Sequence, residues 1–307
     1  MSSAIGPYAY NAGLLDKKYY AESNGQVTVR IRNTNTGQEL KSTFDVVGDQ
    51  AAVQGNFTFD GVAGQGAKIK LEFLNPYGSK TGQVLPTGNA TDTILGFQVS
   101  CVDGANPAIF IRADDVDIPG TILPNDFNNL PEKLELLERI RRAATVAMGI
   151  AESEDKVAGT IPKIGIVSTS ATHPVLSGET VKKEHVDVVI RFLSDEQPHR
   201  AIPLTAALTS AVAAKIPGTV VEQLLAKEST TKDMLTIGHA SGKIQVSASM
   251  DPEKPHLPLS ASVYRTARRI FEGEVFWTDS GEEEQGLGSI SRSYNLGMAF
   301  VEESGGK

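Results

Sequence analysis

The fold is decided by the stretch QPHRAIPLTAALTSAVAAKI, residues 197–216. From Pro203 onward it predicts a helix that is apolar nearly all round, so the helix should be buried rather than lie on a surface. A buried helix must still satisfy the free N–H groups of its first turn. Arg200 adds a fixed positive charge beside the positive end of the helix dipole, which suits a carboxylate ligand. A simpler role for His199 and Arg200, capping and pairing at the surface, stays open.

Alternating apolar and polar residues predict strands at 26–32 and 67–73, and clusters of Gly and Asn separate the strands of this part of the chain. A second β-rich unit opens at Ile161, with segments at 162–167 and 186–192. A long amphipathic helix is predicted from about Pro131 to Met148, and a last helix over about 262–272. The pattern predicts the α+β class, with two β-units that each need a helix to cover or fill a sheet.

Two predicted turns carry polar side chains that could contact a ligand. The first is HASG (239–242), between two predicted strands, and the second is VDGANP (102–107), at the end of another. Glycines in the first turn would let a ligand approach the backbone closely, and Ser241 could bond a carboxylate oxygen. Turns without any function look similar, so a purely structural interpretation of both stays open.

Bulk properties exclude several classes of function. The net charge of −8 argues against a nucleic-acid partner. The single cysteine, Cys101, excludes an intrachain disulfide, and the five histidines lack metal-ligand spacing. No dinucleotide fingerprint, Walker loop, H-E-x-x-H or G-x-S-x-G motif occurs. Proton transfer or binding by side chains alone is the chemistry that is left.

The chain is expected to work inside the cell, in the cytoplasm, without a membrane partner. Its mean hydropathy is −0.15, and no apolar run approaches the roughly 18 residues that span a bilayer. The first residues lack a basic region followed by an apolar stretch, so no secretory signal is expected. At 307 residues the chain has room for two domains.

Taken in order, short motifs along nearly the whole chain resemble the PrpF family of 2-methylaconitate- and aconitate-type isomerases. The motifs are GPYA (6–9), IRNTNT (31–36), LPTG (85–88), VDGANP (102–107), HRA (199–201), IPGT (216–219), HASG (239–242) and YRTARR (264–269). The resemblance implies two diaminopimelate-epimerase-like domains, each a β-sheet or barrel wrapped round a central helix whose N-terminus faces a shared cleft.

The resemblance also implies the function. It points to cofactor-independent proton-transfer isomerisation, allylic or cis–trans, of an unsaturated di- or tricarboxylate such as 2-methylaconitate or aconitate, without metal. It places these residues at the substrate: Arg200, Thr205, His239, Ser241, Gly242, Asn106, Ser2 and Ser3. Whether the chain forms a homodimer is left open.

The resemblance divides the chain into segments. We expect a first domain at 1–118, a helical connection at 119–160, a second domain at 161–261 and a flexible tail at 278–307. A C-terminal helix at about 262–277 would pack on the first domain.

One departure from the family affects the expected activity. The family carries a Cys-Gly-Asn motif just before the first central helix, which here would begin at residues 1–3. That cysteine and an upstream catalytic lysine have no counterpart, so we expect the first domain to be incomplete at its N-terminal side. Cys101 is no substitute, because it falls inside a predicted strand. Either the natural protein has further residues, or the chain is a catalytically inactive carboxylate-binding or scaffolding relative.

Overall fold

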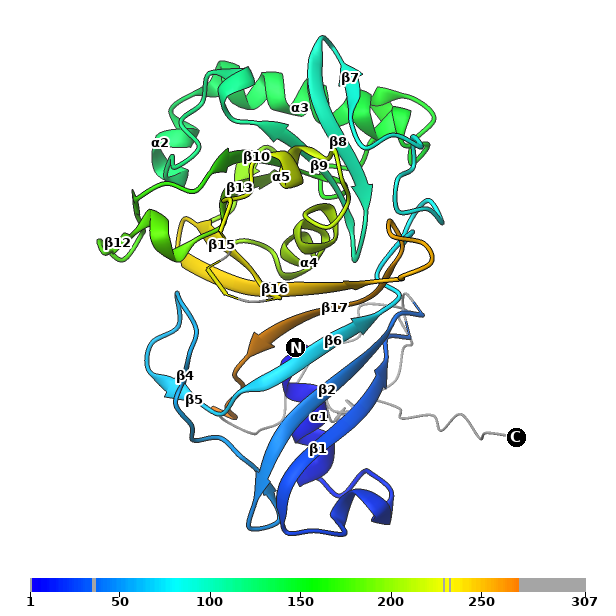
Figure 1. Cartoon of the computed structure of the whole chain (residues 1–307), viewed down its shortest axis with the longest axis vertical. Coiled ribbons are helices and arrows are strands. Elements are labelled where there is room, and N and C mark those ends of the chain that lie inside the picture. Colours follow the sequence, from blue (N-terminus) through cyan, green and yellow to red (C-terminus); the bar gives the residue numbers. More distant parts are fainter. Residues whose placement is uncertain (1, 35–36, 229, 232, 271–307) are drawn as a thin grey trace, which may run out of the picture.

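The helix predicted from Pro203 is α4 (Leu204–Ala213) in the computed structural model, which describes residues 2–34, 37–228, 230–231 and 233–270. All its residues from Ala206 to Ala213 are buried. Pro203 immediately precedes the helix in an extended conformation, as is usual at a helix start. Strands enclose α4 on several sides (Figure 1). The prediction of a buried helix is confirmed.

One mixed sheet of 13 strands holds the described part of the chain together. Its path runs through β1 (Asn24–Arg32), β2 (Glu39–Val47), β6 (Ile69–Leu74), β17 (Pro258–Arg265), β16 (Gly242–Met250), β15 (Leu235–His239), β13 (Val188–Ser194), β10 (Lys163–Thr169), β9 (Pro107–Arg112), β8 (Phe97–Asp103) and β7 (Asp92–Ile94). Beside this path, β3 (Gln50–Ala51) pairs with β2, and β14 (Gln197–Pro198) pairs with β13. Along the path, β9–β10 and β13–β15 are parallel and the other pairs are antiparallel.

The upper half of the molecule has three layers. Helix α3 (Pro131–Ala147) lies on the outer face of β8, β9 and β10, and α4 lies on their inner face. Side chains of β9 alternate accordingly, since Ile109 and Ile111 pack in the cluster with α3, whereas Ala108 and Phe110 pack in the cluster with α4. Strands covered on both faces are apolar throughout, which explains the continuous apolar run in this part of the sequence.

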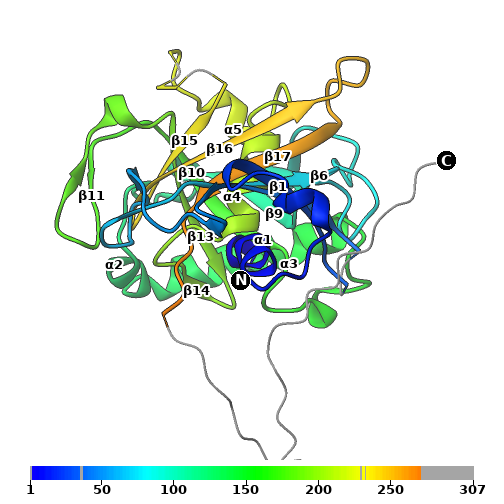
Figure 2. The ribbon, with the colours of Figure 1, turned by 90° about the horizontal axis from the view of Figure 1, so that it is seen from below.

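The lower half has a helix on one face of its strands only. Helix α1 (Ser2–Asn11) packs on β1, β2 and β6. A Cβ atom at Gly6 would lie 2.7 Å from Ser42 Oγ, so a glycine is needed where α1 crosses β2. Figure 1 places the start of α1 near the junction of the halves, and Figure 2 shows the helix end-on, so α1 runs away from the upper half.

The remaining elements are short. They are the hairpins β4 (Phe57–Thr58) with β5 (Gln65–Gly66) and β11 (His173–Pro174) with β12 (Thr180–Val181), the helices α2 (Pro124–Asn128) and α5 (Val220–Gln223), and 3₁₀ turns at Lys17–Tyr20, Asp114–Val116, Glu154–Lys156 and Lys183–His185. The loop of the β4–β5 hairpin reaches the other half, where Asp60 accepts a hydrogen bond from the Lys243 N–H.

The prediction of a helix over about 262–272 is wrong for residues 262–265. Residues 262–265 end β17, which pairs with β6 on one side and β16 on the other. Two neighbouring strands satisfy the backbone of this segment, and this tertiary pairing overrides its helical propensity. Residues 266–270 form no regular element, and the rest of the expected helix and tail lies outside the described residues.

The α+β class is confirmed, but the strands are not grouped in the way that the expected domain limit at residue 118 implies. Strands β8 and β9 surround α4 in the upper half, because β9 pairs in parallel with β10. Residues 97–112 therefore belong with the helix that we assigned to the second domain. Each half does contain one helix against its strands, α1 below and α4 above (Figure 1). Whether the halves fold as separate domains stays a prediction.

Candidate functional site

The start of α4 is tied to the turn between β8 and β9. Asn106 Nδ2 donates a hydrogen bond to Thr205 Oγ1 at 3.0 Å, and Thr209 Oγ1 donates to the backbone oxygen of Asn106 at 2.8 Å. A Cβ atom at Gly104 would lie 2.6 Å from Thr209 Oγ1, so the turn needs a glycine. Asn106 and Thr205 thus meet at the end of the helix where backbone N–H groups lack intrahelical partners.

The turn between β15 and β16 lies against the segment that leads into α4. Ser241 Oγ donates to the backbone oxygen of Arg200 at 2.5 Å, and the Ser241 N–H donates to His239 Nδ1 at 3.2 Å. Arg200 is exposed, and within the described residues its guanidinium has no hydrogen-bond or ion-pair partner. The Arg200 charge therefore belongs to the segment that leads directly into the positive end of the α4 dipole.

The β4–β5 hairpin of the lower half reaches this turn (Figure 1). Asp60 Oδ2 accepts a hydrogen bond from the Lys243 N–H at 2.9 Å. At Gly242, φ is +134° and an added Cβ atom would lie 2.4 Å from Asp60 Cβ. A Cβ atom at Gly61 would lie 3.3 Å from Ser241 Cβ. The hairpin loop therefore packs directly on the 239–242 turn.

The same hairpin also packs on the end of β17. The rings of Phe57 and Tyr264 meet edge to face with their centroids 6.3 Å apart. The Arg265 guanidinium carbon lies 4.2 Å from the centre of the Phe59 ring, a cation–π contact. One short hairpin thus brings the end of β17 and the 239–242 turn to the same place.

Positive charge surrounds His239, whose side chain is 3% exposed. Burial, followed by the charges of Arg191 and Arg265, lowers the pKa of His239 to about 3. Burial also lowers the pKa of Arg191 to about 10, and its guanidinium donates to the backbone oxygens of Ile122 and Gly238 at 2.8 and 3.3 Å. The site therefore has an excess of positive charge, and His239 is neutral at physiological pH.

A neutral His239 can act only as a hydrogen-bond donor through its outer nitrogen. Because Nδ1 accepts from Ser241, the proton of the neutral ring is assigned to Nε2. That nitrogen is buried and has no hydrogen-bond partner among the described residues. An unused buried donor within a cationic site favours an anionic ligand.

Comparison with known proteins decides the family. Residues 1–278 match the PrpF family, described as PrpF protein. The chain is 34% identical to a 3-methylitaconate isomerase from Eubacterium barkeri, over 90% of this chain and 72% of that protein. It is 33% identical to a 2-methyl-aconitate isomerase from Shewanella oneidensis, over 90% and 71%. The chain belongs to the PrpF family.

A solved structure supports the same assignment. The crystal structure of a methylitaconate-delta-isomerase superposes with a TM-score of 0.80 at 33% identity, covering 92% of this chain and 75% of that one. The family assignment and the α+β fold made from sequence motifs are therefore confirmed. Since these relatives are named isomerases, the chain is an isomerase of the PrpF type.

The residues that the PrpF resemblance placed at the substrate fall into three groups. Arg200, His239, Ser241 and Gly242 lie together, and Asn106 and Thr205 form a hydrogen-bonded pair at the start of α4. Ser3 lies at the start of α1, and the side chain of Ser2 lies outside the described part. The glycine at 242 gives room to Asp60 rather than to a ligand. The roles of all these residues stay predictions.

Three residues at the site were not singled out from the sequence as ligand contacts. Arg191 lies inside the apolar run of β13, and a cation in such a run is a signal that sequence reasoning could have used. Arg265 belongs to the quoted YRTARR motif. The sequence predicted a helix there, whereas Arg265 is the last residue of strand β17. Asp60 gave no signal, because only the fold brings its loop to the 239–242 turn.

Cys101 is excluded from catalysis by its position. It is fully buried in β8 within the cluster that faces α3. Burial raises the pKa of its thiol to about 12, so the thiolate needed for chemistry does not form. The expectation that Cys101 does not replace the family's cysteine agrees with this environment.

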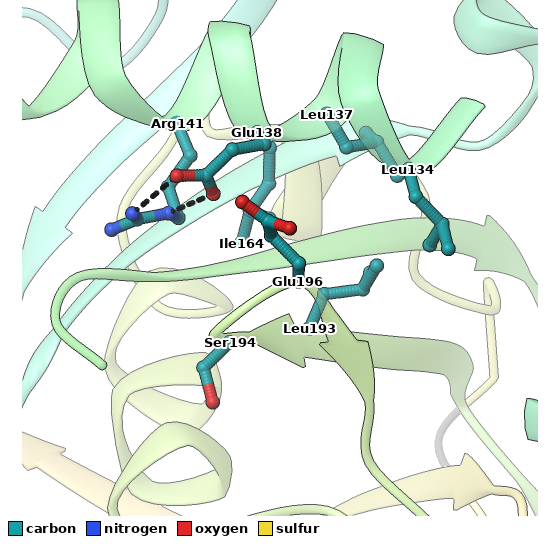
Figure 3. A pocket seen from close by; sticks show the side chains of 8 residues that line it. All are labelled: Leu134, Leu137, Glu138, Arg141, Ile164, Leu193, Ser194 and Glu196. Carbon is teal, nitrogen blue, oxygen red and sulfur yellow. Dashed lines mark hydrogen bonds and ion pairs between the residues drawn. The ribbon is translucent and has the colours of Figure 1, made fainter. Parts of the chain in front are cut away.

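Two hollows in the described part of the chain lie away from the candidate residues. One, of about 10 Å³, lies between α3 and the sheet, beside the Arg141–Glu138 ion pair. Ser194 lines it only in part, since its side chain points away from that ion pair (Figure 3). The other, of about 130 Å³, lies beyond the C-terminal end of α4, next to Lys215 and Met234. A hollow the size of one water cannot hold a dicarboxylate.

The described residues contain no cluster of three or more His, Cys, Asp or Glu side chains suited to a metal ion. None of their helices has the length and apolar character that crossing a membrane requires.

Proposed function

We propose that this protein isomerises an unsaturated di- or tricarboxylate of the methylitaconate or methylaconitate kind by moving a proton, without a metal or organic cofactor. The observation that carries the proposal is the unpaired guanidinium of Arg200, beside the start of the buried helix α4 and the Ser241 turn. The names of the relatives supply the class of substrate.

The chemistry explains why cations should gather here. Removing a proton next to a conjugated carboxylate spreads negative charge onto that carboxylate in the transition state. A preorganised guanidinium and free helix N–H groups stabilise this charge more than the ground state. Arg200 would supply the guanidinium, and the start of α4 at Thr205 would supply the free N–H groups. His239, with a pKa of about 3, would donate a hydrogen bond and would not carry the proton.

The experiment measures binding and proton exchange separately. Methylitaconate and 2-methylaconitate are titrated calorimetrically and then incubated with the protein in deuterated water, with NMR following their exchangeable protons. We expect saturable binding of both acids. Deuterium incorporation above the buffer rate would show that a base within residues 1–307 takes up the proton in place of the family's cysteine and lysine, which have no counterpart there. Binding without any exchange would contradict isomerisation while leaving the carboxylate site intact.

Arg200→Ala tests the anchor against a matched surface arginine. Charge-assisted hydrogen bonds are worth about 1.5–3 kcal/mol, so this variant should bind the acids about 10- to 150-fold more weakly. Arg139→Ala is the control, since Arg139 is exposed on α3, on the far side of the sheet. Equal affinities of the two variants would assign Arg200 to a surface role.

A further inference from the structure

Arg265 is a second guanidinium at the site without an anionic partner. It ends β17, opposite Ile69 of β6, and is only partly exposed. Its charge contacts the ring of Phe59, but within the described residues it makes no hydrogen bond or ion pair. Burial lowers its pKa, which means that its charged form is partly desolvated. A partly buried cation without a counter-ion is unfavourable unless a ligand supplies the negative charge.

The loop of the β4–β5 hairpin contacts both Arg265 and the Ser241 turn. Phe59 holds Arg265, and the next two residues, Asp60 and Gly61, contact the turn. Arg265 also acts electrostatically on the buried His239 of that turn. The two sites are therefore neighbours, although Arg265 belongs to the strand that joins the halves.

The acid nearest to this cluster is already engaged. Asp60 accepts the N–H of Lys243 at 2.9 Å, and Lys243 Nζ lies 3.9 Å from the same oxygen. No ion pair joins Asp60 to Arg265 among the described residues. Arg200 likewise has no side-chain partner among the described residues, and its backbone oxygen accepts a hydrogen bond from Ser241 Oγ of the same turn. The Ser241 turn is thus next to two arginines whose charges have no anionic partner among the described residues.

We propose that Arg265 is a second carboxylate anchor, so that the site selects acids carrying two carboxylates, one bound by Arg200 and the other by Arg265. The proposal rests on the carboxylate site of the proposed function and adds a specificity-determining residue to it. The Phe59 ring contacts the Arg265 guanidinium at 4.2 Å, and a guanidinium whose motion is restrained favours two parallel hydrogen bonds to one carboxylate.

The test removes one charge at a time from protein and ligand. The probes are itaconate, a dicarboxylate, and its two monomethyl esters, and the variants are Arg200→Ala and Arg265→Gln. Each variant should weaken itaconate binding about 10- to 150-fold. Each monoester should respond to one of the two variants and not to the other, because it lacks the carboxylate that the other arginine would bind. Arg268→Gln, an exposed neighbour outside the site, should leave all affinities unchanged.

Failure of this inference can be told apart from failure of the proposed function. If Arg200→Ala weakens binding of the diacid and both esters while Arg265→Gln changes none, Arg265 is no anchor and the carboxylate site stands. If neither variant weakens binding, both proposals are wrong. Arg265→Gln acting equally on diacid and esters would mean a structural role and would overturn the inference.

Further variants keep the test valid if Arg265→Gln does not fold. Phe59→Leu leaves both charges in place and removes only the ring on which Arg265 rests. Phe59→Leu should weaken the binding of itaconate more than the binding of the monoester whose affinity does not change in Arg265→Gln. Arg265→Lys should restore part of the affinity, since a lysine keeps the charge but cannot bind a carboxylate with two parallel bonds. Equal affinity of Phe59→Leu and wild type for every probe would contradict the anchor.

Discussion

Burial and nearby positive charges keep the His239 ring neutral in the folded protein. The stability of the protein should therefore depend on pH. Its pKa of about 3 in the folded state lies below the 6.5 of an exposed histidine. Above pH 6.5 the ring is neutral in both the folded and unfolded states, so stability is unaffected. As pH falls below 6.5, only the unfolded state takes up the proton, and stability is lost progressively down to about pH 3.

The pH dependence of melting tests this at the residue scale. Between pH 6.5 and 5 a histidine that stays neutral when folded lowers the free energy of unfolding by about 2 kcal/mol. His239→Asn, which cannot be protonated, should flatten the fall in melting temperature over this range. His173 and His199, whose pKa values burial also lowers, remain in the variant and keep part of the slope. An identical slope in variant and wild type would show that His239 titrates normally.

Cys101 offers a second test at this scale. Its burial in β8 and its pKa of about 12 leave almost no accessible thiolate at pH 8. A disulfide reagent such as DTNB should therefore fail to modify the native protein within an hour and should modify one thiol per chain at once in denaturant. Fast modification of the native protein would mean that β8 is not covered by α3.

At the scale of the element, β17 joins the two halves of the molecule. It pairs with β6 below and β16 above, so each of its backbone N–H groups faces a neighbouring strand. A proline within it removes one such donor and clashes with the ladder. An interior strand therefore tolerates no proline, whereas the first turn of a helix does.

Ser262→Pro separates the strand from the helix that the local sequence favours. In β17 this change should lower the free energy of unfolding by about 1–3 kcal/mol for the unpaired carbonyl alone. At the start of a helix it would be nearly neutral. Ser262→Ala, which keeps the N–H, is the matched control, and chemical denaturation measures both. Equal stability of the two variants would argue against the pairing of β17 with its neighbours.

At the scale of the whole molecule, the upper and lower halves are covered unequally. Strands β9 and β10 lie between α3 and α4, and β13, buried throughout, lies between α4 and the β11–β12 hairpin. Among the described residues a helix, α1, covers only one face of β1 and β2, and these strands alternate between buried and exposed residues. Backbone amides covered by layers on both faces open only with large-scale unfolding.

Hydrogen exchange followed by mass spectrometry should therefore divide the chain by layers rather than by sequence order. Peptides from 97–112, 163–169 and 188–194 should exchange slowest, together with α4, and peptides from 24–32 and 39–47 faster. Strands β8 and β9 (97–112) are the most informative peptides. They lie before the expected domain limit at residue 118 but pack around α4. If they exchanged as fast as β1 and β2, the three-layer packing around α4 would be wrong.

What the sequence by itself determined is local. Apolar residues all round 204–213 predicted a buried helix, alternation predicted β1 and β6, β-rich segments predicted β10 and β13, and glycines predicted the turn at 239–242. The family motifs also identified Arg200, Ser241 and His239 as neighbours of one site. These features follow from periodicity and turn chemistry within a few residues, which a single segment contains.

Only the tertiary structure decided which distant segments meet. Residues 262–265 became a strand because two partners, β6 and β16, satisfied their backbone. Asp60, Ser241 and Arg265 came together because the β4–β5 hairpin packs on both a turn and a strand end. Such contacts join residues 183 positions apart, as for Asp60 and Lys243, or 206 apart, as for Phe59 and Arg265. They depend on side-chain packing that no local pattern encodes.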